Sequence, residues 1–244
     1  MTVLVLHDLG HDRSQLAGML PPLPDVWAPD LPGHGSSPEP ADPAELSIYE
    51  MARAVAQGLP ARAAKVPLTV IGLGLGAAVG LRIAMAGVHR IDRFVAIRPS
   101  FSDSPMTQNL YAYPVLGALM QSHPRDATAR FETSGVFNDI RRASEAAAAE
   151  LRGIALDPRT RAPHAALTTT PGHPAYQPHE FAGFDVPSMV IADPSSPVHP
   201  LSLAYAWQSM LGAALRVTPE RGRRPQAADD WIRQQLWEYL VGVQ

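Results

Sequence analysis

The chain has 244 residues, of which 46% are hydrophobic and 18% charged, and its formal net charge is −3. This balance is typical of a globular protein with one domain or a core and a lid, and it gives no electrostatic basis for binding nucleic acid or an anionic membrane. No cysteine is present, which excludes disulfides, thiolate metal ligands and a cysteine nucleophile.

Strands and helices alternate through the first hundred residues. Residues 2–6, 26–28, 67–72 and 93–99 are short apolar runs that predict buried strands. The apolar residues between Ile48 and Leu59 fall on one helical face, and residues 76–87 predict a second helix that ends at Gly87. This order predicts a parallel sheet covered by helices.

The alternation breaks after Pro99. Residues 100–185 contain one clear helical segment, the alanine-rich stretch 141–154, between loops rich in Pro, Thr and His. Strand and helix patterns then return and end in an amphipathic helix over 229–243. We therefore predict a core of residues 1–99 and 186–244, with residues 100–185 inserted as a cap over the strand ends, where parallel sheets bind ligands.

The stretch GLGLG, residues 72–76, follows a predicted strand and opens a predicted helix. One interpretation is a dinucleotide-binding loop, but the acidic residue that should end the next strand is missing, because Asp92 precedes that strand. The other interpretation is a nucleophile elbow of the G-x-S-x-G type, in which Gly74 occupies the position of the serine. We favour the elbow.

The chain resembles the α/β-hydrolase fold superfamily in the elbow and in four further segments, which read VLVLHDLG, DLPGHGSS, VPSMVIADPSSPVHP and VTPERGRRP. The resemblance implies an α/β-hydrolase-type, mostly parallel sheet flanked by helices, with a helical cap and without the two leading strands of the superfamily. It also implies an oxyanion hole formed by the backbone N–H groups of Leu9 and Leu75.

The positions that the resemblance assigns to the Ser-His-Asp triad hold Gly74, Arg223 and Ser196. None of these side chains suits its assigned role, so we expect the standard serine-hydrolase mechanism to be lost. A structural explanation of Gly74 also stays open, because glycine is the residue that best tolerates a strained elbow.

These departures suggest a cofactor-independent, non-hydrolytic enzyme that acts on a hydrophobic small molecule by cyclisation, elimination or carbon–carbon bond formation, as in a tailoring pathway. We expect backbone oxyanion stabilisation with acid–base help from His7, Asp8 or His199. Two alternatives stay open: a catalytically silent binding protein, and a hydrolase that uses another serine, such as Ser100 or Ser196.

The remaining candidates are substrate-binding side chains near the predicted strand ends and in the cap: His34, Arg98, Ser100, Met106, Tyr111 and Tyr113. Asp8 is equally well explained as a turn cap, and Arg98 as half of a surface salt bridge. The histidines of the cap are spaced too irregularly to predict a metal site, so we expect no metal and no cofactor. The first residues form neither a basic leader nor an apolar run that could span a bilayer, so we expect a cytoplasmic protein with no membrane partner. The oligomeric state is not predicted.

Overall fold

The computed structural model describes residues 2–156, 164–221 and 225–242. Its centre is a parallel sheet with the strand order β2-β1-β3-β4-β5-β6. The strands are β1 (Thr2–Leu6), β2 (Val26–Trp27), β3 (Leu68–Leu73), β4 (Ile91–Ile97), β5 (Ser188–Ala192) and β6 (Ala214–Val217). The predicted parallel sheet is confirmed, although β2 is shorter than expected.

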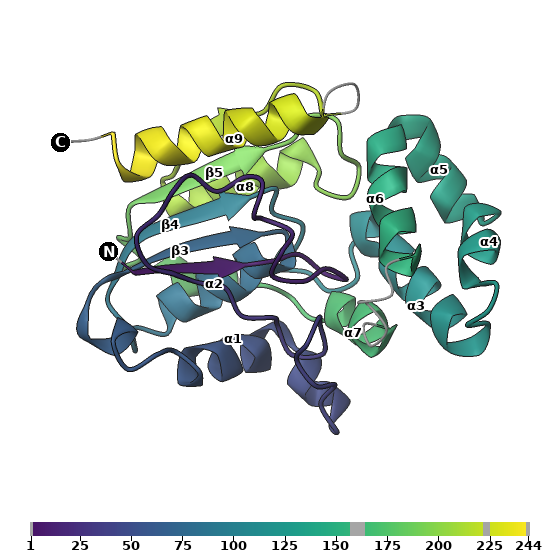
Figure 1. Cartoon of the computed structure of the whole chain (residues 1–244), viewed down its shortest axis with the longest axis horizontal. Coiled ribbons are helices and arrows are strands. Elements are labelled where there is room, and N and C mark those ends of the chain that lie inside the picture. Colours follow the sequence, from purple (N-terminus) through teal and green to yellow (C-terminus); the bar gives the residue numbers. More distant parts are fainter. Residues whose placement is uncertain (1, 157–163, 222–224, 243–244) are drawn as a thin grey trace.

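Side chains alternate between the two faces of the sheet. Leu4, Val70 and Phe94 belong to the apolar cluster on the face covered by α1 (Ile48–Gln57), α2 (Leu75–Met85) and α8 (Leu201–Leu211). The opposite face packs against α9 (Pro225–Leu240), as Figure 1 shows. β1, β3 and β5 are fully buried because both faces are covered, which explains their apolar sequences.

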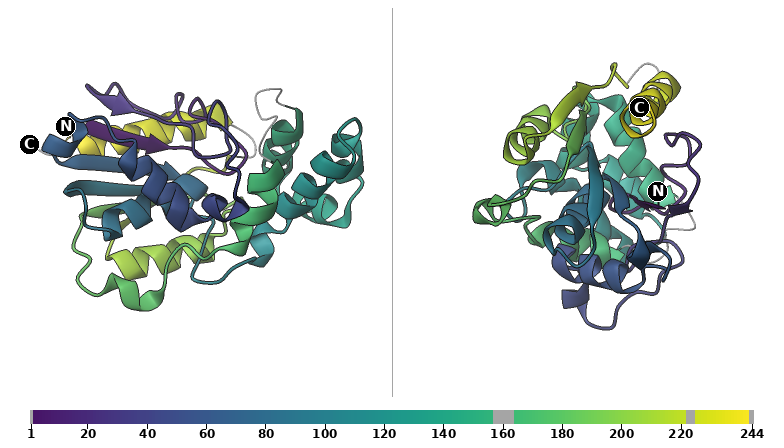
Figure 2. Two further views of the ribbon diagram at one scale, coloured as in Figure 1. Left: turned by 90° about the horizontal axis from the view of Figure 1, so that it is seen from below. Right: turned by 90° about the vertical axis from the view of Figure 1, so that its left-hand side faces the viewer.

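Between β4 and β5 the described residues form five α-helices: α3 (Ala112–Ser122), α4 (Ala127–Glu132), α5 (Gly135–Ala143), α6 (Glu145–Leu156) and α7 (His164–Thr169). We call them the α3–α7 layer. The arrowheads of the central strands point toward this layer (Figures 1 and 2), so it stands beside the carboxyl ends of the sheet.

The alanine-rich stretch 141–154 is not one helix, as the sequence pattern suggested. Ser144 adopts an extended backbone with φ −157° and ψ 108°, which ends α5 at Ala143. Its Oγ then accepts a hydrogen bond from the backbone N–H of Ala147 at 3.3 Å and caps the start of α6. None of the helices in the described parts of the chain is long and apolar enough to cross a membrane.

Candidate active site

The carboxyl ends of three adjacent strands meet at one edge of the sheet. Leu6 pairs with Gly72 and Leu73 pairs with Ile97, so the residues that follow β1, β3 and β4 lie side by side. The N–H of Gly74 donates to the carbonyl of Ile97 at 3.0 Å and continues this register past the strand. Asp8, Gly74 and Arg98 therefore lie close together although the sequence separates them widely.

Gly74 forms the sharp turn between β3 and α2, with φ 52° and ψ −110°. A side chain there would be strained by this backbone conformation, and an added β-carbon would lie 1.9 Å from Oδ1 of Asp8. Gly72 and Gly76 are required for a different reason, because a β-carbon on either would lie 2.2 Å from a backbone carbonyl oxygen. The structure thus has the geometry of an elbow, and each glycine of GLGLG has a steric cause.

The carboxylate of Asp8 fills the space above Gly74. Its Oδ1 accepts hydrogen bonds from the backbone N–H groups of Leu9 and Leu75, both at 2.7 Å. These are the two donors that the resemblance assigned to an oxyanion hole, and they do converge on one oxygen. The oxygen that they hold belongs to the protein itself.

His199 reaches the same carboxylate from the loop between β5 and α8. Its Nε2 lies 2.9 Å from Oδ2 of Asp8, and its Nδ1 lies 3.1 Å from Oγ of Ser196. The backbone N–H of His199 also donates to Oγ of Ser196 at 3.3 Å. All three side chains are buried, so a carboxylate, an imidazole and a hydroxyl form a continuous chain of hydrogen bonds.

The electrostatics keep Asp8 ionised despite its burial. Burial raises the pKa of a carboxyl group, but the hydrogen bond and charge of His199, the charge of His11 and the N–H of Leu75 outweigh it, and the pKa of Asp8 falls to about 2. Asp8 is 1% exposed and His199 is 3% exposed, so the pair is closed to solvent in this structure.

Backbone groups hold both ring nitrogens of His7, whereas in His34 only Nδ1 has a partner and Nε2 is buried without one. Nε2 of His7 accepts the N–H of Leu31 at 2.9 Å, so Nδ1 carries the proton and donates to the carbonyl of Asp8 at 2.8 Å. Burial lowers the pKa of His7 to about 4 and that of His34 to about 3. The two rings are 5.2 Å apart. Both nitrogens of His7 are therefore occupied by backbone groups, and Asp8 and His199 remain as the pair with reactive geometry.

Arg98 is buried and pairs with a carboxylate that is only partly exposed, so the contact is not a surface salt bridge. It has a positive φ of 47° directly after β4, and its two terminal nitrogens each lie 3.0 Å from an oxygen of Glu150 on α6. Arg221 contacts the same carboxylate at 3.4 Å. Burial raises the pKa of Glu150, but the charge and hydrogen bonds of Arg98 outweigh it and lower the pKa to about 2. Glu150 thus joins the α3–α7 layer to the strand ends.

The other predicted residues divide between this site and a separate cleft. Ser100 is buried with an unpartnered Oγ, and Tyr113 is buried with its pKa raised by burial and by the carboxylates of Asp8 and Glu150. Met106 has a positive φ of 49° in a loop. Tyr111 is half-exposed and lines a cleft of about 660 Å³ beside Pro197 and Pro200, which flank the segment that carries His199.

Arg223 lies outside the described residues. Among the residues that the structure does describe, no three His, Cys, Asp or Glu side chains are arranged to hold a metal ion.

Asp8 and His199 were both candidates from the sequence, but their contact with each other was not predicted. Two departures from the superfamily pattern could have predicted this contact. Position 8 has an aspartate where the superfamily has glycine, and position 74 has a glycine where the superfamily has serine. Two matched exchanges at neighbouring strand ends indicate that one side chain has taken the space of another.

A model of the Alpha/beta hydrolase family matches residues 3–242. A search of curated proteins found no match.

Similar solved structures include a hydrolase from Oleispira antarctica, with a TM-score of 0.70, 18% identity and coverage of 98% of this chain and 90% of that one. A thermophilic esterase from Thermogutta terrifontis gives a TM-score of 0.69 and 18% identity over 98% and 90% of the two chains. The enol-lactonase from Burkholderia xenovorans LB400 gives 0.68 and 17% over 96% and 90%.

These neighbours are named as hydrolases, esterases and lactonases, which contradicts our expectation of a non-hydrolytic enzyme. The expectation was wrong because it took three unsuitable side chains as the loss of hydrolytic machinery, whereas the fold brings Asp8 and His199 to the elbow. The tailoring reactions inferred from that loss have no remaining basis. Because the family model spans nearly the whole described sheet and its flanking helices, the chain belongs to the alpha/beta hydrolase family.

Proposed function

We propose that this protein is a hydrolase of a small hydrophobic substrate and that the carboxylate of Asp8, not a side chain at position 74, is its nucleophile. One observation carries the proposal. Asp8 lies over the elbow with Oδ1 held by the N–H groups of Leu9 and Leu75, while Oδ2 lies 2.9 Å from Nε2 of His199. Carboxylates are established nucleophiles in covalent catalysis.

In the first step, Oδ2 of Asp8 attacks a saturated carbon of the substrate. A carbon–oxygen bond forms, the bond to the leaving group breaks, and its electron pair departs with the leaving group. This step requires His199 as the imidazolium, with Nε2 donating to Asp8 and Nδ1 to Ser196, and the Nε2 proton goes to the leaving group. The product of this step is an ester of Asp8.

In the second step, the unprotonated Nε2 of His199 takes a proton from water, and the oxygen of that water attacks Cγ of Asp8. Negative charge then develops on Oδ1, which already accepts both backbone N–H groups, so its stabilisation needs no rearrangement. The intermediate collapses, the proton of its new hydroxyl group passes to the departing Oδ2, and the alcohol that carries Oδ2 is released. One water oxygen remains in the regenerated carboxylate, and His199 is again protonated.

The chemistry of the nucleophile limits the substrate class. A carboxylate whose pKa is about 2 is a much better leaving group than an alkoxide, so after attack on an ordinary ester carbonyl the intermediate would expel Asp8 again and would not form the high-energy anhydride. Displacement at a saturated carbon produces only an ester. We therefore propose an epoxide, an alkyl halide, or an ester or lactone cleaved at its alkyl–oxygen bond.

Substrate entry requires movement, because Asp8 and His199 are both buried. The α3–α7 layer, which we propose to be the cap, contacts the strand ends through Glu150 and Arg98. Separation of α6 from β4 would break this contact and uncover the pair.

A single turnover in ¹⁸O-labelled water, with enzyme in excess over a panel of these substrates, tests the proposal. The expected result is heavy oxygen in the tryptic peptide 1–13, which contains Asp8, and an unlabelled alcohol. With an alkyl halide, whose departing halide needs no proton, the variant His199→Gln should accumulate the ester on the same peptide, and Asp8→Asn should form none. Heavy oxygen in the first-turnover product, with an unlabelled peptide, would show direct attack by water or a serine nucleophile and would overturn the assignment.

A further inference from the structure

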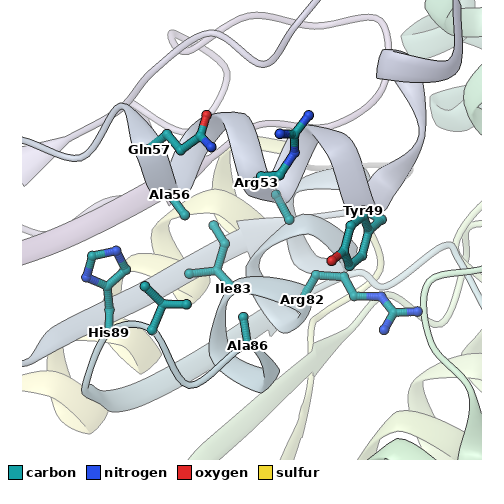
Figure 3. Close-up of a pocket in the computed structure, with 10 residues that line it drawn as sticks. Tyr49, Arg53, Ala56, Gln57, Arg82, Ile83, Ala86 and His89 are labelled. Carbon is teal, nitrogen blue, oxygen red and sulfur yellow. The ribbon is translucent and has the colours of Figure 1, made fainter.

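A groove lies between α1 and α2, toward the end of α2 that is farther from Leu75 and the elbow. Its volume is about 520 Å³, within the range of small-molecule sites. Figure 3 shows Ile83 in its middle, with His89 at one end and Tyr49 and Arg82 at the other. The walls are made of small apolar side chains: Ala52, Ala56, Ile83, Ala86 and Val88.

The His89 end of the groove is basic. His89 also lines an adjoining cavity of about 160 Å³, together with Lys65 and Arg90. Lys65 is the one lysine of the chain. Neither Lys65 nor Arg90 forms an ion pair with any residue that the structure describes. The described residues that line the two cavities include no carboxylate.

The opposite end differs. Arg53 is paired with Glu50, and Arg82 is paired with Glu180, so their charges are largely balanced. The apolar groove therefore runs from an end whose charges are paired to His89, and the two unpaired cations line the smaller cavity on the other side of His89. A protein whose overall net charge is −3 has here a local excess of positive charge.

We propose that this groove binds a medium-chain carboxylate, with its hydrocarbon chain along Ile83 and Val88 and its carboxylate beside Lys65, His89 and Arg90. The apolar walls suit the chain, and the unpaired cations suit the anionic head. Neither the apolar walls nor the cations would give measurable binding alone, because the groove is open on one side and exposed ion pairs are individually weak. The site is independent of the proposed reaction at Asp8.

Calorimetric titration of the whole protein with decanoate, below the concentration at which it forms micelles, tests the proposal. Decyltrimethylammonium has the same chain with the opposite charge. We expect saturable binding of decanoate with one site per chain and much weaker binding of the cation. Failure of decanoate to bind, or equal binding of both probes, would overturn the proposal.

Variants locate the site. Lys65→Glu combined with Arg90→Glu should weaken decanoate binding about tenfold, whereas Arg125→Glu combined with Arg141→Glu makes the same change in net charge on the α3–α7 layer and should not. Ala86→Trp should fill the groove and abolish binding, whereas Ala54→Trp, an exposed position of α1 outside the groove, should leave it unchanged. Unchanged affinity in the Lys65/Arg90 variant, or equal loss in both tryptophan variants, would place the ligand elsewhere.

Discussion

Oδ1 of Asp8 lies where a β-carbon on Gly74 would be, only 1.9 Å from the ideal position of that atom. The two residues therefore exclude one another: the chain can have a carboxylate above the elbow or a side chain on it, but not both. This mutual exclusion yields the first prediction.

Gly74→Ser should lower the free energy of unfolding by roughly 2–4 kcal/mol, because it forces a side chain onto a positive-φ turn and displaces the buried Asp8. The second variant, Asp8→Gly, empties the space. In the double variant the steric part of the cost should disappear, so the two changes should couple favourably by more than about 1 kcal/mol in a urea-unfolding cycle. Additive effects would mean that Asp8 does not occupy this space.

Ser196 should act as a positioning residue for His199. A serine hydroxyl donates and accepts hydrogen bonds, so it can satisfy Nδ1 of His199 whichever nitrogen carries the proton. Ser196→Ala removes this contact and should reduce kcat about tenfold with little change in KM. Ser196→Asp supplies an acceptor at the same place and should restore most of the rate.

Steady-state kinetics with a substrate identified in the labelling panel measure both variants. If Ser196 were instead the nucleophile, Ser196→Ala and Ser196→Asp would be equally inactive, which separates the two roles.

Glu150→Gln should loosen the contact between α6 and the strand ends. The change removes the charge that balances Arg98 and Arg221, and we expect a loss of about 1–3 kcal/mol in the free energy of unfolding. Hydrogen exchange of the α6 amides should become faster, since the helix can separate more easily. Glu145→Gln, an exposed change on the same helix, is the matched control. Equal exchange in the two variants would contradict this account.

Acid should destabilise the protein through His7 and His34. Their folded-state pKa values, about 4 and about 3, lie below the ordinary value of 6.5. Between the folded-state pKa values and pH 6.5, the unfolded state binds more protons than the folded state. The free energy of unfolding is therefore highest above pH 6.5 and falls as the pH drops toward 4, by roughly 3 kcal/mol for each histidine.

Urea unfolding at a series of pH values measures this slope. His34→Gln should reduce the slope between pH 6.5 and 4, and His179→Gln, at an exposed position, should not. A slope that is the same in the wild type and in His34→Gln would show that His34 is protonated in the folded state.

Local patterns were enough to predict the sheet and the turn at Gly74. Strands buried on both faces leave unbroken apolar runs, and the turn requires glycines at positions 72, 74 and 76. The contact between Asp8 and His199 has no such local signal, because the two residues are 191 positions apart and meet only through the order of the strands. The helices of the α3–α7 layer were mostly missed, and Ser144 breaks the one that was predicted.

The row of strand ends formed by Asp8, Gly74 and Arg98 has a consequence for how related proteins are recognised. The distance between neighbouring parallel strands is less than the length of an aspartate side chain plus its hydrogen bond. Side chains from two neighbouring loops can therefore reach the same position, and either loop can supply the reactive atom there. A motif search for a serine at the elbow scores such a protein as inactive. A search for any oxygen or sulfur atom within hydrogen-bonding distance of both paired amides, whichever residue supplies it, would find it.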